Sequence, residues 1–102
     1  MNFFDKVYGL CKEIPEGKVS TYGSIADKLG SKAYRLVGQA LRNNPDPINV
    51  PCYKIVRNNG EIGGYSGSDP KNIMRKIKML ESDGVIVENG KIDLKKYLFK
   101  FE

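Results

Sequence analysis

Apolar side chains recur every three or four residues in the first part of the chain, which is the spacing of one face of a helix. This pattern predicts a helix over Phe3–Glu13 and a second one that ends near residue 29 and is capped by Ser20 or Thr21. A third helix, over 32–43, separates an apolar face from a face that carries Arg35, Gln39 and Arg42. Two short helices joined by a brief turn, the second with a basic stripe, are typical of a helix-turn-helix and also of any small helical bundle.

The second half of the chain combines short extended segments with one more helix. Segments 48–50 and 53–56 look extended, and the glycine-rich segment 61–68 is predicted to be a loop or wing. Asp69 followed by proline predicts the start of a helix. The spacing of its apolar residues predicts a buried face with Ile73, Ile77 and Leu80. The opposite, exposed face is predicted to carry Arg75, Lys76 and Lys78. Asn89-Gly90 then predicts a hairpin of 85–87 and 91–93, after which 94–101 packs back.

Length and composition limit the architecture further. With 102 residues, 40% of them hydrophobic and 28% charged, the chain is predicted to form one α+β domain over 1–102, with 82–102 as a C-terminal hairpin extension. No stretch approaches the ~20 apolar residues of a membrane helix, and the N-terminus lacks a signal-peptide pattern. We therefore expect a cytoplasmic, monomeric protein.

The residue types exclude several kinds of site. The chain has no histidine, which rules out Ser-His-Asp and Cys-His catalysis and His-ligated zinc. Its two cysteines, Cys11 and Cys52, are too few for a four-cysteine metal site, and in a reducing cytosol we expect no disulfide between them. Cys11 lies on the apolar face of the first helix, so we expect a buried, unreactive thiol there.

Positive charge is concentrated in the middle third of the chain. The net charge is +5, and residues 31–60 contribute +4 of it, because they contain one acidic residue, Asp46, and five basic ones: Lys32, Arg35, Arg42, Lys54 and Arg57. This distribution suits a polyanion such as nucleic acid. It equally fits the solvated face of a lysine-rich protein.

Candidate chemistry centres on Cys52, which follows a proline in the run Pro51-Cys52-Tyr53-Lys54. Neighbouring cations such as Lys54 and Arg57, together with helix-end dipoles, favour the reactive thiolate form of a cysteine. A structural cysteine on a strand is the alternative interpretation.

Three segments, 35–45, 51–56 and 64–67, together resemble the DNA-binding domain of the methylated-DNA–protein-cysteine methyltransferases, also called O6-alkylguanine-DNA alkyltransferases. The resemblance runs from Phe3 to Glu81. It implies a winged helix-turn-helix whose thin helix, with Gly38, enters the minor groove of double-stranded DNA. It also implies that an alkylated guanine is flipped out and passes its alkyl group to the protein's own cysteine, once per molecule, without a metal or organic cofactor.

The resemblance assigns roles to residues of this sequence. Cys52 matches the alkyl acceptor, Asn44 the asparagine that braces its turn, and Glu81 a buried glutamate. Arg35 matches the arginine that fills the space of the flipped base. The alkylated base would be contacted by Tyr22, the Ile55 carbonyl, Tyr65 and Ser66. The remaining DNA contacts would come from Lys32, Gly38, Gln39, Arg42 and Arg57.

The sequence departs from the family pattern at Tyr53. The family usually has Pro-Cys-His-Arg, in which the histidine, a water and the glutamate draw the proton from the thiol. A phenol with a pKa near ~10 is a poor base. An unactivated thiol with a pKa of ~8.5 is still about 3% thiolate at pH 7, so loss of all activation slows transfer by only ~30-fold. We expect Lys54 to recover part of this loss, and Tyr53 to relay hydrogen bonds from Cys52 to Glu81.

Other functions stay open at this point. Short relatives without the family's additional N-terminal domain include the alkyltransferase-like proteins, which have tryptophan in place of the cysteine and hand the lesion to excision-repair partners. The presence of Cys52 favours transfer over such a lesion sensor. A winged-helix regulator that reads undamaged sequence and a fragment of a larger repair protein are further alternatives; the start at Met1 counts against the fragment.

Overall fold

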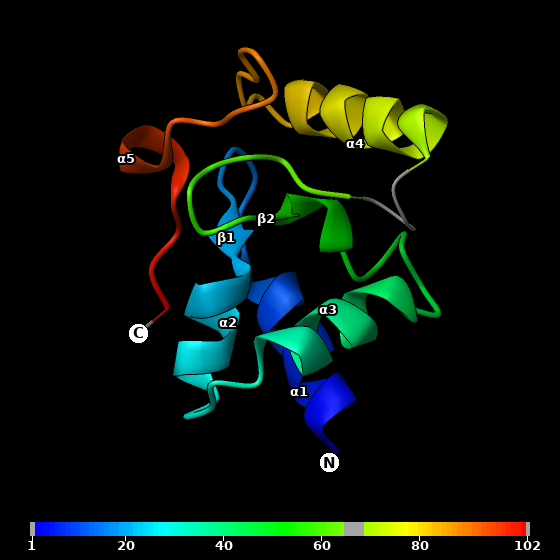
Figure 1. The fold of residues 1–102 in the computed structure, drawn as a ribbon, viewed down its shortest axis with the longest axis vertical. Helices are drawn as coiled ribbons and strands as arrows, with labels where there is room; N and C mark the ends of the chain where they lie inside the picture. Colours follow the sequence, from blue (N-terminus) through cyan, green and yellow to red (C-terminus); the bar gives the residue numbers. More distant parts are fainter. Residues whose placement is uncertain (1, 65–68, 102) are drawn as a thin grey trace.

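A pair of very short strands lies between a group of three helices and a fourth helix, as Figure 1 shows. The computed structural model describes residues 2–64 and 69–101. The helices are α1 (Phe3–Glu13), α2 (Tyr22–Lys28), α3 (Tyr34–Arg42), the 3-10 helix η1 (Cys52–Lys54), α4 (Pro70–Ser82) and α5 (Leu94–Tyr97). The strands are β1 (Ser20–Thr21) and β2 (Ile55–Val56).

The first two helices begin at polar caps. Asn2 Oδ1 accepts a hydrogen bond from the amide of Asp5 at 2.8 Å, so that α1 forms over the residues that the apolar spacing predicts. At the start of α2 the cap is Thr21, whose Oγ1 accepts from the amide of Ser24 at 3.0 Å. This confirms the predicted cap at Thr21, and α2 ends at Lys28, one residue before the predicted end. Ser20 and Thr21 also form strand β1, which was not predicted.

β1 and β2 pair in parallel, with Ser20 opposite Ile55 and Thr21 opposite Val56. Both strands are buried. Parallel strands end at the same edge of a sheet. The residues that follow them, Tyr22 and Arg57, therefore leave the sheet beside each other. The sequence did not predict this pairing, which fixes how the two halves of the chain meet.

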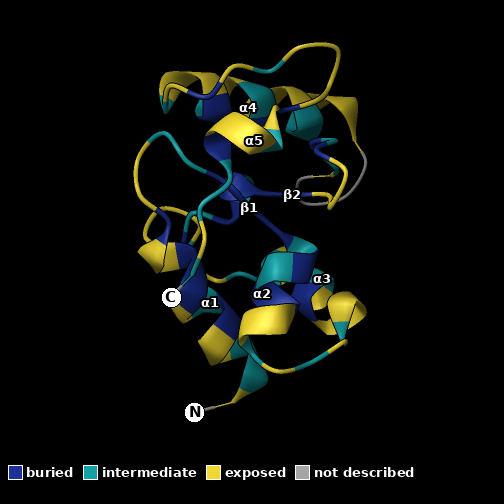
Figure 2. Ribbon diagram, turned by 90° about the vertical axis from the view of Figure 1, so that its left-hand side faces the viewer, coloured by how far each residue is buried: buried dark blue, intermediate teal, exposed yellow. Residues whose placement is uncertain are grey.

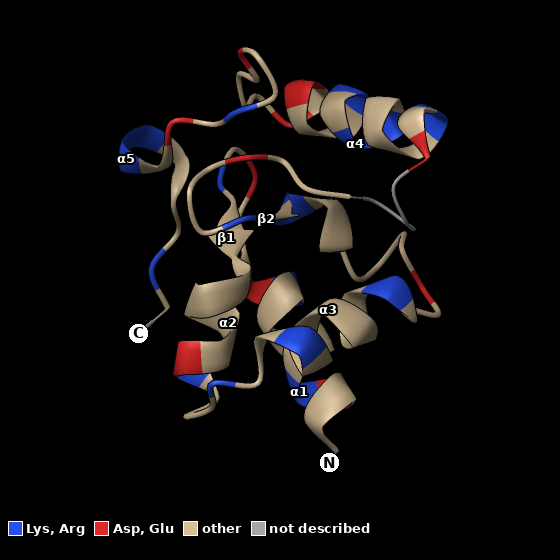
Figure 3. Cartoon of the chain, in the orientation of Figure 1, with Lys and Arg blue, Asp and Glu red and all other residues tan. Residues whose placement is uncertain are grey.

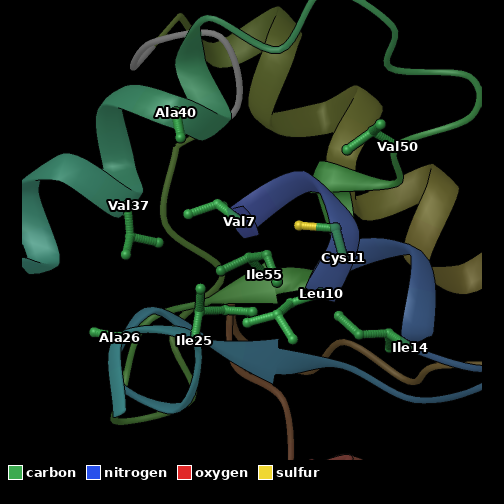
Figure 4. Close-up of a cluster of buried hydrophobic side chains, with 10 residues drawn as sticks. All are labelled: Val7, Leu10, Cys11, Ile14, Ile25, Ala26, Val37, Ala40, Val50 and Ile55. Atoms are coloured by element: carbon green, nitrogen blue, oxygen red, sulfur yellow. The ribbon is translucent and has the colours of Figure 1, made fainter. Parts of the chain in front are cut away.

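One hydrophobic cluster fills the space between α1, α2, α3 and β2 (Figure 4). It consists of Val7, Leu10, Cys11, Ile14, Ile25, Ala26, Val37, Ala40, Val50 and Ile55. Cys11 is fully buried within it, which confirms the prediction of a core thiol.

A second cluster lies between the strands, α4 and the C-terminal segment. It consists of Val19, Val56, Ile62, Leu80, Val85, Ile92 and Tyr97. The C-terminal segment packs back as predicted: the Val19 amide donates to the Tyr97 carbonyl at 2.9 Å, and the Phe99 amide donates to the Val19 carbonyl at 2.8 Å. Figure 2 shows buried backbone at the strands and exposed outer faces on the helices.

The prediction for the polar face of α4 is wrong at one residue. Lys76 was placed outside with Arg75 and Lys78, but it is 1% exposed. Its aliphatic stem packs inside while its ammonium reaches backbone carbonyls, so burial of the side chain is compatible with hydrogen bonding.

The segment before β2 is not extended as predicted. Residues 47–49 form a turn that the Asp46 carboxylate closes, because it accepts from the amide of Asn49 at 3.3 Å and from its side chain at 2.9 Å. These bonds lower the pKa of Asp46. Of the predicted strand 53–56, only Ile55–Val56 is extended, since Cys52–Lys54 forms η1.

The C-terminal hairpin is smaller than predicted. Glu88 and Lys91 exchange two backbone hydrogen bonds of 2.9 Å across a turn at Asn89 and Gly90, whose φ values of 52° and 72° suit a tight hairpin turn. Segments 85–87 and 91–93 form no strands beyond this bridge; Lys91 also pairs with Glu61. In the described part of the chain, no helix has the length and apolar character needed to cross a membrane.

Candidate functional site

Cys52 is the first residue of η1 and directly precedes β2. Its amide donates to the Val50 carbonyl at 2.8 Å, and its own carbonyl accepts from the amide of Ile55. The residue is 8% exposed, yet unlike Cys11 it belongs to neither hydrophobic cluster. Cys52 is a free cysteine on a hydrogen-bonded turn before a strand rather than a packing residue within one.

Asn44 holds the turn that leads to Cys52. Its Nδ2 donates to the Val50 carbonyl at 2.8 Å, and its Oδ1 accepts from the amide of Asp46 at 3.0 Å. The Val50 carbonyl thus accepts from both the Asn44 side chain and the Cys52 amide. This is the bracing position that the family resemblance implies for Asn44.

Asn58, which follows β2 closely, forms a hydrogen bond with the first turn of α2. Its Oδ1 accepts from the amide of Gly23 at 2.8 Å, which satisfies one of the free donors at the helix N-terminus. A Cβ on Gly23 would lie only 2.8 Å from that oxygen, so any other residue would force the Asn58 side chain to move. The sequence pattern gave no sign of this role of Asn58, which fixes the position of the neighbouring Tyr22.

Close to this hydrogen bond, Gly63 lies beside Tyr22 and Arg57. Gly63 has a φ of 71°, and a Cβ there would lie 3.8 Å from the Tyr22 hydroxyl and 3.4 Å from Cγ of Arg57. Burial raises the pKa of Tyr22, and the nearby Arg57 guanidinium works against that rise. The Tyr22 hydroxyl is therefore a protonated hydrogen-bond donor at neutral pH. The charge of Cys52 also acts on Tyr22, so the thiol lies within electrostatic reach.

Lys76 extends from α4 to the backbone that follows Cys52. Its Nζ donates to the Ile55 carbonyl at 2.6 Å and to the Gly64 carbonyl at 3.2 Å. Burial lowers the pKa of Lys76 to about 8, and the neighbouring Cys52 thiolate acts in the opposite direction. The Ile55 carbonyl, predicted to bind the base, already accepts this bond; a carbonyl oxygen has two lone pairs.

Lys54 has a different partner from the one predicted. Its Nζ lies 3.3 Å from Oδ2 of Asp83 and donates to the carbonyls of Ile14 and Pro15 at 3.3 and 3.1 Å. Asp83 Oδ2 also accepts from the amide of Gly17 at 3.0 Å. The Lys54 ammonium thus joins the end of α1 to the end of α4. Because an aspartate neutralises it, it is a poor stabiliser for the thiolate.

The predicted burial of Glu81 is wrong. Glu81 is exposed near the end of α4, whereas Asp83, two residues later, is part-buried and lies beside Tyr53. Tyr53 and Asp83 line an open pocket together with Lys78, Met79 and Ser82. Glu81 lies on the outward face of α4, so the acidic residue that binds Lys54 and the Gly17 amide is Asp83. The relay from Tyr53 to Glu81 stays a prediction.

Four of the predicted DNA-binding side chains are exposed cations or amides on and around α3. Arg35, Gln39 and Arg42 are exposed on α3, and Lys32 is exposed just before it. Figure 3 shows positive charge at both ends of α3. A Cβ on Gly38 would meet nothing within 4 Å, so the helix surface is open there.

Arg57 is exposed as well, whereas Lys54 is buried, so the basic surface of the middle third has one cation fewer than the sequence count. Tyr65 and Ser66 lie outside the described residues. Within residues 2–64 and 69–101, no cluster of acidic or cysteine side chains is arranged to hold a metal ion.

The family description "6-O-methylguanine DNA methyltransferase, DNA binding domain" matches residues 2–85. The chain belongs to this family. This O6-methylguanine methyltransferase domain is 39% identical over 97 residues to the "DNA base-flipping protein" of Vibrio parahaemolyticus, with 93% of each chain covered. It is 44% identical over 100 residues to the "Bifunctional methyltransferase/endonuclease" of Picrophilus torridus, but spans only 32% of that relative.

Two solved structures that match the fold are complexes with DNA. S. pombe Atl1, in complex with damaged DNA containing O6-carboxymethylguanine, has a TM-score of 0.85 and 33% identity, with 97% of this chain and 95% of that one covered. Mycobacterium tuberculosis OGT in complex with DNA has a TM-score of 0.74 and 36% identity over 82% of this chain and 49% of that one. The fold is thus the mixed helix and small-strand DNA-binding domain of the O6-methylguanine methyltransferase family.

Proposed function

We propose that this protein repairs O6-alkylated guanine in double-stranded DNA by transferring the alkyl group to Sγ of Cys52. The observation that carries the proposal is the place of Cys52, a free cysteine on a turn that Asn44 braces, just before the strand that pairs in parallel with the one leading to Tyr22. Membership of the methyltransferase family supports the same reaction. In a single in-line step the thiolate sulfur bonds to the alkyl carbon while the bond from that carbon to O6 breaks. Guanine leaves with the electron pair and takes up a proton from solvent.

DNA is bound, in this proposal, by a winged helix-turn-helix formed by α2, α3 and the segment after β2. The exposed cations Lys32, Arg42 and Arg57 are suited to phosphates. Arg35, exposed in the first turn of α3, fills the space of the flipped base, and the open surface at Gly38 lets the helix approach the minor groove. Specificity for the lesion follows because a mispaired alkylguanine is less costly to extrude than a normal base.

The base binds between the ends of the two parallel strands. The Tyr22 hydroxyl stays protonated and is suited to donate a hydrogen bond to the base. The Ile55 and Cys52 carbonyls are suited to accept from the guanine amino group. Asn58 acts through Tyr22, because its bond to Gly23 sets the first turn of α2.

Peptide mass spectrometry tests the reaction. The protein is incubated with a duplex that carries one O6-methylguanine, then digested and mapped. We expect one methyl group on Cys52 and none on Cys11, because burial raises the pKa of Cys11 to about 12 and keeps its thiol protonated. Cys52→Ser is expected to bind the duplex without gaining a methyl group, while the matched Cys11→Ser retains transfer. Methylation of Cys52→Ser would show that the nucleophile is another residue.

A second candidate function is a lesion sensor that flips the base without transfer. Two observations favour it: S. pombe Atl1 and the Vibrio base-flipping protein match nearly the whole chain, and Tyr53 occupies the place of the family histidine. A sensor has a higher affinity for the alkylated duplex than for an undamaged one, yet its mass stays unchanged after prolonged incubation. The same mapping experiment therefore separates the two functions.

A further inference from the structure

Lys76 is a buried cation that no carboxylate neutralises within the described residues. It is 1% exposed, and its Nζ bonds only to neutral carbonyls among the contacts described, those of Ile55 and Gly64. Burying an ammonium group without an opposite charge is costly. Such a cost is typical of groups that serve a reaction rather than the fold.

Cys52 is the one acidic group whose charge is described as acting on Lys76. The Cys52 charge also acts on Tyr8, Cys11 and Tyr22, which are neutral at neutral pH. Two groups act on the Lys76 charge: the Cys52 thiolate, which favours it, and the Arg57 guanidinium, which opposes it. The geometry agrees, because the Ile55 carbonyl that Lys76 holds at 2.6 Å belongs to the residue whose amide bonds back to the Cys52 carbonyl. Lys76 and Cys52 are thus connected through one turn of backbone.

We propose that the Lys76 ammonium stabilises the thiolate form of Cys52 and so replaces the histidine that this chain lacks. This inference deepens the proposed function and rests on it. The Cys52 thiol releases its proton to solvent, while Lys76 remains charged and offsets the sulfur's negative charge. The sulfur then attacks the alkyl carbon as described above. Opposite charges favour each other's ionised forms, so a buried ammonium bonded to the backbone that follows Cys52 favours the thiolate.

Lys76 is a positioning residue as well. Its two hydrogen bonds join the end of η1 to Gly64, the last described residue before the segment that contains Tyr65 and Ser66. A structural clamp alone would not change how the thiol responds to pH, so the pH profile of the thiol separates charge stabilisation from clamping.

Alkylation by iodoacetamide, a small thiolate reagent, tests the proposal without DNA. The rate at Cys52 is followed by peptide mass spectrometry across pH in wild type, Lys76→Met, Lys76→Arg and the control Lys71→Met, an exposed lysine on the same helix. We expect Lys76→Met to lower the rate at neutral pH by up to ~30-fold and to move the midpoint of the profile to higher pH. Lys76→Arg and Lys71→Met should resemble wild type.

A profile of folded Lys76→Met that superimposes on wild type would overturn the proposal, as would the absence of any alkylation at wild-type Cys52. If Lys76→Met does not fold, NMR titration of the Lys76 side chain replaces it: the Lys76 midpoint should fall in Cys52→Ser, and an unchanged midpoint would overturn the proposal. These outcomes are independent of DNA repair. Failure of methyl transfer with an intact Lys76 effect would refute the proposed function alone.

Discussion

Two buried lysines lie beside the turn that carries Cys52, and they differ in what surrounds their charge. Lys54 is 5% exposed and is paired with Asp83, with two carbonyls of the α1 end as further partners. Lys76 is 1% exposed and donates to two carbonyls, with the Cys52 thiol as its anionic neighbour. A carboxylate thus neutralises the charge of Lys54, whereas the described hydrogen bonds of Lys76 go to neutral carbonyls.

The difference shows how a domain without histidine can still favour a thiolate. A cation favours the thiolate form of a nearby cysteine, and a carboxylate paired with that cation weakens the effect. The sequence places Lys54 two residues from Cys52, which made it the expected activator, but the structure pairs it with Asp83. The proposed activator is Lys76, which lies far along the chain and donates to the backbone that follows Cys52.

The largest effect is expected for the ion pair. Lys54→Met leaves Asp83 buried without its cation, which is expected to lower the free energy of unfolding by about 3 kcal/mol. Urea denaturation measures it. Lys76→Met, the matched control, removes a buried charge that has no carboxylate partner and loses only two hydrogen bonds to carbonyls, so it is expected to lose less stability than Lys54→Met. Equal losses in both variants would contradict the distinction between the two lysines.

The second prediction concerns pH. The pKa of Lys76 is about 8 in the folded protein and ordinary when unfolded, so between these values the unfolded chain binds more protons and stability rises with pH. Relative to Lys76→Met, wild type should gain about 2 kcal/mol between about pH 7 and about pH 9.5. Cys11 acts in the opposite direction above its ordinary pKa, but it is present in both proteins and cancels in the difference. A constant difference would mean that Lys76 has an ordinary pKa.

The third prediction asks whether an exposed cation, unlike the two buried ones, acts on DNA. Arg35→Ala is expected to slow repair of methylguanine in a duplex by about 10-fold, while reaction with free O6-benzylguanine changes less than about 2-fold, because the free base needs no flipping. Single-turnover rates measure both. Arg75→Ala, an exposed arginine on α4, is the control. Equal losses on duplex and free base would refute the intruding role.

The smallest effect is expected at Tyr53. If Lys76 already supports the thiolate, Tyr53→His should speed transfer only about 2-fold in wild type and about 10-fold in Lys76→Met, because the two groups act on one thiol and their effects are not additive. Transfer rates from the methylated duplex measure both backgrounds. The same gain in both would mean that histidine and Lys76 act independently.

Patterns of local spacing predicted the helices well, because helix faces and caps are short-range features. α1 matches its prediction, and Asp69 and Pro70 start α4 as expected. Lys76 was placed outside because a charged residue is rarely buried, and only the carbonyls of Ile55 and Gly64, distant in sequence, explain its position.

The acidic partner was misassigned for a similar reason. Glu81 was predicted to be buried, but it and Asp83 both lie near the end of α4, and only the orientation of that helix decides which of the two is part-buried. The parallel pairing of β1 with β2 is too short to have a periodic signal, although it brings Tyr22 beside Arg57. The role of Asn58 likewise depends on a contact with a residue distant in sequence, Gly23. The site is therefore formed by long-range contacts that the pattern of one sequence does not contain.

Counting repaired lesions tests the central claim most directly. A fixed amount of protein is titrated with an excess of duplex containing O6-methylguanine, and the restored guanine is measured once the reaction stops. Transfer to Cys52 predicts a plateau at one restored guanine per protein molecule, with an equal number of methylated cysteines. A plateau at zero despite tight lesion binding, or continued repair beyond one lesion per molecule, would contradict it.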